Sequence, residues 1–284
     1  MRTTQPHLPE MRTGEKMKLN LHTHSVKSDG VFTPEEVVKI QRDDGIEAMS
    51  LTDHDNVSGI DEAIRAGEKY GLKVLPGIEL SCYSVCEIHI LGYNFDYKNP
   101  DFVQELENVK DLRRQRINKT VDKLHALNVP FDDSALDFEN ANLGRVHIAK
   151  EMVRQGLAKS VSDAFYQYLG SGKKAYIPGY RLRPMDGVKL IKKYGGVAVV
   201  AHPVYIPKDK LELLVAGLVP YGLDGLECYY STFNETDTKR FLSLAAKYNL
   251  ITTAGTDLHD ANLYVSPTYD CTKVDMRSLK KLGL

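Results

Sequence analysis

Short apolar runs alternate with amphipathic, helix-like segments along most of the chain. The runs lie at residues 19–22, 46–51, 73–80, 87–93, 197–202, 224–230 and 250–257. Runs of this length, rich in apolar and β-branched residues and bounded by glycine and polar residues, are typical of buried strands. Between the first two runs, Thr33-Pro34-Glu35-Glu36 predicts a capping box that opens a helix through about Arg42. The alternation predicts an α/β fold with a parallel sheet, and seven strands suggest a barrel.

The alternation is interrupted between the fourth and fifth runs. Residues 101–183 have mainly helical patterns and no convincing central strand, which predicts an inserted helical subdomain. The barrel domain would then comprise residues 17–100 and 184–284. The first 16 residues lack the apolar segment of a secretory signal, and we expect them to form a disordered tail.

Composition and charge exclude several classes of protein. Of the 284 residues, 42% are hydrophobic, and 37 Lys plus Arg against 38 Asp plus Glu give a net charge of -1. This balance argues against a nucleic-acid coat or a polybasic membrane binder. The most apolar stretch, residues 197–201, is far shorter than the roughly 20 residues of a membrane span. Four scattered cysteines form no disulfide framework. We expect a cytoplasmic protein, with neither duplex DNA nor a membrane as its partner.

Histidines and carboxylates gather where the predicted strands end. His22 and His24 follow the first strand at a spacing that puts both side chains on one side of an extended chain. The other residues in comparable positions are Asp53, His54, Glu79, Glu87, His89, His202, Asp257 and His259. In a β/α barrel the C-terminal ends of the strands meet at one mouth, so residues far apart in sequence come together. Imidazole mixed with carboxylate suits Zn, Mn or Fe(II), and carboxylates that bridge two cations allow more than one ion.

The alternative explanation is structural, because a single histidine at a strand end is usually part of the packing. Here six of the nine histidines occupy such ends together with several carboxylates. Unpaired buried charges are costly, so packing does not explain the joint pattern. The sequence therefore predicts a polynuclear metal site. A P-loop is rejected, because SGKKA at residues 171–175 lacks the required glycine and the Ser or Thr after lysine.

Six motifs occur in a familiar order: HTHSVKSDG (22–30), LTDHD (51–55), GIELS (77–81), HILGY (89–93), AHP (201–203) and GTDLH (255–259). Together they resemble the PHP family, named for polymerase and histidinol phosphatase, over nearly the whole chain. The resemblance implies a distorted (β/α)7 barrel, similar to a TIM barrel, that binds two or three divalent cations. It also implies hydrolysis of phosphoesters by a metal-activated hydroxide.

The resemblance assigns a role to each residue of the motifs. One cation would be held by His22, His24, Glu79 and Asp257, a second by Glu79, His89 and His202, and a third by Asp29, His54 and His259. Glu79 would bridge the first two cations. Asp53 and His202 are the candidates for a catalytic role, Asp53 by orienting a ligand imidazole.

Part of the predicted insertion resembles the helical insertion of PHP proteins that act on nucleotides. In those proteins an arginine and a lysine contact phosphate, and the matching residues are Arg145 and Lys173 or Lys174, with His147 beside Arg145. Without the resemblance we would interpret them as solvated surface residues. A denser basic group, Arg113, Arg114 and Arg116, is interpreted as a solvated helix face. Weaker candidates for stacking a base are Tyr176, Tyr180, Tyr229 and Tyr230.

We therefore expect a metal-dependent phosphoesterase whose insertion caps the substrate. It would hydrolyse a phosphate ester of a small nucleotide, such as a nucleoside 3′,5′-bisphosphate, or trim short RNA from its 5′ end. Two alternatives stay open. One is a histidinol-phosphate phosphatase, and the other is a non-catalytic regulatory module that binds metal.

Overall fold

Seven strands form a sheet that nearly closes on itself. The computed structural model describes residues 17–84, 86–136, 143–178, 182–260 and 274–284, so the expected N-terminal tail lies outside the described residues. The strands, in sequence order across the sheet, are β1 (Leu19–Asn20), β2 (Ala48–Leu51), β3 (Lys73–Tyr83), β4 (Glu87–Tyr93), β5 (Val197–Val200), β6 (Gly225–Tyr230) and β7 (Ile251–Gly255). Backbone bonds from Leu21 N to Ala254 O (2.8 Å) and from Asp257 N to His22 O (2.9 Å) join the two ends of the sheet. The predicted seven-stranded barrel is confirmed.

Strand β4 runs against both of its neighbours, which corrects the expectation of a parallel sheet. It pairs antiparallel with β3, from Gly77 opposite Tyr93 to Tyr83 opposite Glu87, and antiparallel with β5. Only residues 84–86 separate β3 from β4. A connection of three residues can close a hairpin, whereas a parallel pair needs a crossover of a dozen residues or more. The start of β4 therefore lies at the same mouth as the C-terminal ends of the other strands.

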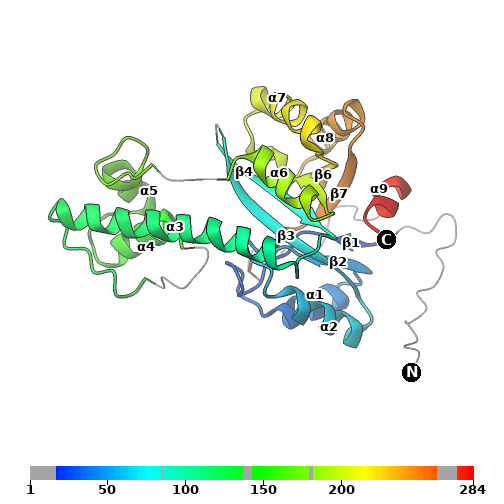
Figure 1. The fold of residues 1–284 in the computed structure, drawn as a ribbon, viewed down its shortest axis with the longest axis horizontal. Coiled ribbons are helices and arrows are strands. Elements are labelled where there is room, and N and C mark those ends of the chain that lie inside the picture. Colours follow the sequence, from blue (N-terminus) through cyan, green and yellow to red (C-terminus); the bar gives the residue numbers. More distant parts are fainter. Residues whose placement is uncertain (1–16, 85, 137–142, 179–181, 261–273) are drawn as a thin grey trace.

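Helices cover the sheet on two sides (Figure 1). They are α1 (Pro34–Asp43), α2 (Ile60–Tyr70), α6 (Pro184–Lys193), α7 (Lys208–Leu218), α8 (Glu235–Lys247) and α9 (Met276–Lys281), with short 3-10 turns at Pro203–Tyr205 and Val219–Tyr221. Helix α1 begins as the sequence predicts. Thr33 Oγ1 accepts a hydrogen bond from Glu36 N (3.3 Å), and the Glu36 carboxylate accepts one from Thr33 N (2.8 Å).

The insertion has a hydrophobic core of its own. It consists of α3 (Pro100–Ala126), α4 (Arg145–Arg154), α5 (Val161–Ala164) and a π-helical turn at Phe165–Leu169. Phe102 and Leu106, near the start of α3, belong to the barrel core, whereas Ile117 and Leu124 pack with Ile148 of α4 in a separate core. Helix α3 thus extends from the barrel, and α4 and α5 lie along its far end, as Figure 1 shows. Within the described residues, no helix has the length and apolar character needed to cross a bilayer.

Candidate metal centre

A single carboxylate, that of Glu79 on β3, lies among five imidazoles at the mouth of the barrel. The side chain of Glu79 is fully buried. Its Oε2 lies 3.2 Å from each of His22 Nε2, His24 Nε2 and His54 Nδ1, and its Oε1 lies 2.9 Å from His89 Nδ1 and 3.0 Å from His202 Nε2. The two oxygens face different imidazoles, which is the arrangement needed for a carboxylate that bridges two cations.

Four atoms of the first group meet at distances that suit one cation. His22 Nε2 and His24 Nε2 lie 3.2 and 3.0 Å from Asp257 Oδ1, and each lies 3.2 Å from Glu79 Oε2. Ligand atoms about 2.1 Å from a shared cation are about 3.0 Å apart at a right angle and about 3.4 Å apart at the tetrahedral angle. All four atoms are buried, and none has a hydrogen-bond partner among the described residues. Because buried polar atoms are rarely left unpaired, the four fit a shared divalent cation.

The second group is equally compact. Besides their contacts with Glu79, His89 Nδ1 and His202 Nε2 are 3.1 Å apart. His89 reaches the group because β4 is antiparallel, which places the start of this strand at the mouth. With β4 parallel, His89 would lie near the opposite end of the barrel.

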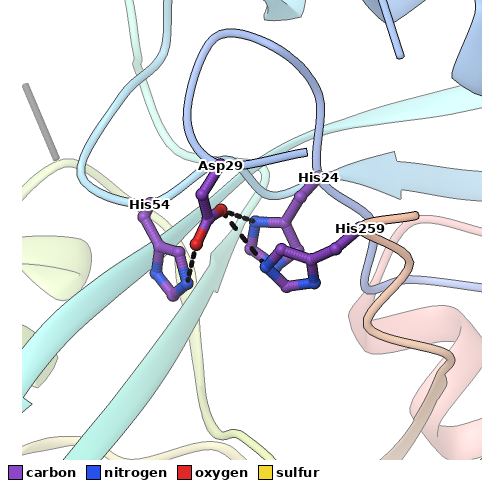
Figure 2. A group of neighbouring side chains, drawn as sticks. All are labelled: His24, Asp29, His54 and His259. Carbon is purple, nitrogen blue, oxygen red and sulfur yellow. Dashed lines mark ion pairs between the residues drawn. The ribbon is translucent and has the colours of Figure 1, made fainter. Parts of the chain in front are cut away.

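A third group surrounds Asp29, in the loop after β1 (Figure 2). Asp29 Oδ1 lies 3.2 Å from His259 Nε2 and 3.8 Å from His24 Nδ1, and Oδ2 lies 3.8 Å from His54 Nε2. These distances are wider than those of the other two groups. The structure therefore brings all nine residues predicted as metal ligands into one cluster, with this group the most open.

Two residues of the cluster have a left-handed backbone. The angle φ is 23° at His202, which follows β5, and 55° at Asp257, which follows β7. Such conformations cost residues other than glycine about 1–3 kcal/mol and concentrate at functional sites. The strain at both positions supports a functional role for these side chains.

The buried groups shift the pKa values of one another. Burial opposes a charge on His24, but the carboxylates of Asp257 and Glu79 outweigh it and raise the pKa of His24 to about 9. In the same way, Glu79 overcomes burial and raises the pKa of His89 to about 10. Burial, with the neighbouring His24 and His89, lowers the pKa of His54 to about 4. The surrounding imidazoles outweigh burial at Glu79 and hold its pKa well below the usual range. The imidazoles of His24 and His89 are thus protonated at neutral pH without metal. Because an imidazole binds a cation only in its neutral form, metal binding would release these protons.

Two residues orient the cluster in a way that the sequence analysis did not predict: Glu227 was given no role, and Tyr230 was named only as a weaker candidate for stacking a base. Glu227, fully buried on β6, accepts hydrogen bonds from His22 Nδ1 (3.1 Å) and from the backbone N of His202 (2.7 Å). The hydroxyl of Tyr230 donates to Asp257 Oδ2 (2.9 Å). Glu227 thereby keeps the hydrogen of His22 on Nδ1 and leaves Nε2 available to a cation. The signal was present, because Glu227 is the one carboxylate inside the apolar run 225–230.

The carboxylate of Asp53 holds the loop after β1 and is linked to a ligand imidazole through a serine. Its carboxylate accepts hydrogen bonds from Ser25 N (2.7 Å), Ser25 Oγ (2.8 Å) and Ser28 Oγ (2.6 Å). Ser28 Oγ in turn lies 3.5 Å from His24 Nδ1. Asp53 thus reaches the imidazole of His24 through Ser28 Oγ, and its expected role in orienting a ligand imidazole stays a prediction.

A cavity of about 540 Å³ separates the cluster from the insertion. It is lined by residues of the cluster on one side and by basic residues on the other: Asp29, His54 and His89 from the barrel, and Arg113, Arg116, Arg145, His147 and Lys150 from the insertion. Arg145 and His147 thus share a cavity with the cluster, and their contact with phosphate stays a prediction. Lys173 and Lys174 line a separate hollow beside Tyr166, so the structure does not bring these lysines to the cluster.

Arg113 and Arg116 also differ from the expected solvated helix face. Arg113 Nη2 donates to Oδ2 of the buried Asp55, whose Oδ1 accepts a hydrogen bond from Ser81 N (3.0 Å). Arg116 is itself buried and donates from Nε to the carbonyl oxygen of Ile177 (2.9 Å). Both arginines lie on the inner face of α3, and Arg113 ties this helix to the mouth of the barrel.

Residues 20–181, more than half of the chain, match the family model of the PHP domain. The chain belongs to the PHP domain family. This PHP protein is 32% identical to a 5'-3' exoribonuclease of Haemophilus influenzae over 246 residues, which cover 85% of this chain and 90% of the relative. It is 29% identical to a 3',5'-nucleoside bisphosphate phosphatase of Chromobacterium violaceum over 247 residues, 85% of this chain and 87% of the relative.

Solved structures extend the comparison of this PHP protein to three dimensions. One, from Bifidobacterium adolescentis and assigned to the metal-dependent phosphoesterases, has a TM-score of 0.73 and 27% identity and covers 94% of this chain and 96% of its own. An amidohydrolase from Chromobacterium violaceum, with bound sulfate, has a TM-score of 0.76 and 27% identity and covers 93% and 96%. The predictions of a PHP fold and of a metal-dependent enzyme that hydrolyses phosphoester bonds are confirmed.

Proposed function

We propose that this PHP protein hydrolyses a phosphate ester of a small nucleotide, such as a nucleoside 3′,5′-bisphosphate, or releases nucleotides from the 5′ end of a short RNA. The observation that carries the proposal is the cavity with the His and carboxylate cluster on one wall and basic side chains on the other. A substrate with two phosphates could place one at each wall. The two activities have the same chemistry, and the names of two relatives correspond to them.

Two or three divalent cations, of Mn, Fe or Zn, would be held by the residues of the cluster. The proposed ligands are His22, His24, Glu79 and Asp257 for one cation, Glu79, His89 and His202 for a second, and Asp29, His54 and His259 for a third. Cations bound there would activate a water molecule for in-line attack and neutralise the phosphoryl oxygens. Glu227 and Tyr230 would hold His22, His202 and Asp257 in place for this task.

The basic wall would bind the second phosphate. Arg145 Nη1 donates to the carbonyl oxygen of Leu169 (2.7 Å), which fixes the guanidinium at the cavity. His147 Nδ1 accepts a hydrogen bond from Gly144 N (3.0 Å), so the neutral ring carries its hydrogen on Nε2. Burial and the nearby Lys150 lower the pKa of His147, which keeps the ring neutral at pH 7. Nε2 can then donate to a phosphate oxygen.

The same wall disfavours histidinol phosphate as the substrate. Arg145 and Lys150 place positive charge opposite the cluster, whereas the charge of Arg113 is balanced by Asp55. A second phosphate would be attracted to this wall, whereas the ammonium group of histidinol phosphate would be repelled by it. The charge of the cavity therefore supports a nucleotide substrate.

Hydrolysis of three compounds tests the proposal: a nucleoside 3′,5′-bisphosphate, a 5′-phosphorylated dinucleotide and histidinol phosphate, each with Mn²⁺ and then with excess chelator. We expect Mn²⁺-dependent turnover of one or both nucleotides and little of histidinol phosphate. The variant His22→Ala should lose turnover and keep its fold. Its matched control is His125→Ala, since this exposed imidazole bonds to the carbonyl oxygen of Phe131 outside the cluster. Bound metal without turnover of any compound would favour a non-catalytic module, and preferred turnover of histidinol phosphate would overturn the nucleotide assignment.

A further inference from the structure

A second cavity, of about 310 Å³, adjoins the one that faces the cluster. Arg116, Arg145 and Phe165 line both cavities, whereas Tyr83 and Tyr176 line only the second. The rings of Phe165 and Tyr176 come from the insertion, and that of Tyr83 comes from the barrel. The second cavity is therefore bounded by aromatic rings on both sides and is continuous, through Arg145, with the basic wall.

The position of Tyr83 relative to the cluster follows from the strand that carries both. Tyr83 is the last residue of β3, four residues after Glu79, and four residues of strand span about 14 Å. Side chains two and four positions apart lie on the same face of a strand, so Tyr83 shares a face with Glu79 and with Ser81, which lines the first cavity. Tyr83 is also 41% exposed. The partly exposed ring of Tyr83 thus lies on the same face of β3 as Glu79, farther along the strand.

Arg145 provides a second flat surface in the cavity that Tyr83 lines. Its guanidinium carbon lies 5.5 Å from the ring centroid of Phe165 and 5.5 Å from that of Tyr176. Aromatic rings and guanidinium planes are the surfaces on which proteins stack the bases of single-stranded nucleic acids. Of the parts of a nucleotide, the base is the one that fits a space lined by rings next to a phosphate-binding arginine.

We propose that the second cavity is a nucleobase subsite, in which the base stacks on Tyr83 beside Arg145. This inference rests on the proposed function, because it places the base of the same nucleotide whose phosphates meet the cluster and the basic wall. Stacking is tolerant of sequence, since every base has a π-face. The subsite therefore recognises that a base is present and discriminates little among the four bases.

The test compares a nucleoside 3′,5′-bisphosphate with the matching sugar bisphosphate that lacks the base, using the full-length protein with Mn²⁺. For the wild type we expect kcat/KM to be about tenfold or more higher with the nucleotide. In Tyr83→Ala this ratio should fall to near one, because kcat/KM for the nucleotide falls while kcat/KM for the sugar bisphosphate stays unchanged. Tyr83→Phe, which keeps the ring, should retain the ratio. Tyr166→Ala is the matched control, because this exposed tyrosine lies in the hollow beside Lys173, away from both cavities.

The possible results separate the subsite from the proposed function. Equal kcat/KM of the wild type for the two substrates would overturn the subsite, whatever the variants do. A Tyr83→Ala variant that keeps the wild-type ratio would overturn it as well. Tyr83→Leu is a second variant that lacks the ring. Thermal unfolding shows whether each variant is folded, and the result is taken from a folded one. Absence of turnover of the nucleotide by the wild type would overturn the proposed function and the subsite with it.

Discussion

Replacing Glu227 with glutamine removes a charge from beneath the cluster and preserves the shape of the side chain. In the native protein, Oε1 accepts a hydrogen bond from His22 Nδ1 at 3.1 Å and Oε2 accepts one from the backbone N of His202 at 2.7 Å. Glutamine offers one acceptor oxygen to these two donors. We expect the oxygen to stay with the shorter bond to His202, which leaves the amide NH2 group opposite His22.

The consequence falls on the tautomer of His22. Opposite an NH2 group, the neutral imidazole is most stable when Nδ1 accepts a hydrogen bond and Nε2 carries the hydrogen. With a hydrogen on Nε2, His22 has no lone pair to offer the cation that we propose between this atom, Glu79 and Asp257. Loss of such a partner typically lowers metal affinity or activity 10- to 100-fold, or about 1.4–2.7 kcal/mol.

Calorimetric titration of the metal-free protein with Mn²⁺ measures this effect. We expect Glu227→Gln to bind one ion about 10- to 100-fold more weakly than the wild type. The control is Glu235→Gln, which changes an exposed glutamate that pairs with Lys239 on α8, and it should bind Mn²⁺ like the wild type. Equal Mn²⁺ affinities of Glu227→Gln and the wild type, with the fold intact, would refute the reasoning.

Three further results are expected. Addition of Mn²⁺ at about pH 7.5 should release about three protons per chain, since the pKa of His22 is raised well above its usual value and the pKa values of His24 and His89 are raised to about 9 and about 10. A pH indicator would detect the release. Thermal melts of the metal-free protein should show falling stability between about pH 7 and 10, because stabilisation from a raised imidazole pKa is complete below the unfolded value of about 6.5 and is lost as the pH passes the folded values. Rising stability over this interval, or no proton release, would contradict the proposed charge state. Arg145→Ala should raise the KM for a nucleoside bisphosphate about tenfold with little change in kcat, whereas Lys173→Ala should leave both constants unchanged; equal effects would remove the distinction between the two residues.

Most of the cluster could be predicted because metal binding restricts both the type and the position of a residue. His22 and His24 stand at a spacing that directs both to one side, and barrel topology then brings His202 and Asp257 to the same mouth. The direction of β4 was not predicted, since alternating hydrophobicity carries no information about strand direction. The short connection at residues 84–86 does carry it, because three residues cannot form a parallel crossover.

The errors elsewhere have physical reasons as well. Lys173 or Lys174 was expected to contact phosphate because this segment resembles the insertion of nucleotide-acting PHP proteins, but the turn after Leu169 carries both lysines to a different hollow from that of Arg145. Arg113 was interpreted as solvated because helical spacing alone does not show which face meets the barrel. Glu227 was overlooked inside an apolar strand. A carboxylate in a buried strand needs a hydrogen-bond donor nearby, so its presence there predicts a polar partner inside the barrel.

Crystals grown with Mn²⁺ and measured for anomalous scattering would test most directly whether Glu79 bridges two cations. The structure predicts one peak about 2.1 Å from His22 Nε2 and His24 Nε2, and another about 2.1 Å from His89 Nδ1 and His202 Nε2, on opposite sides of the Glu79 carboxylate. Anomalous density confined to other sites, with these imidazoles bonded only to water or protein, would contradict the account.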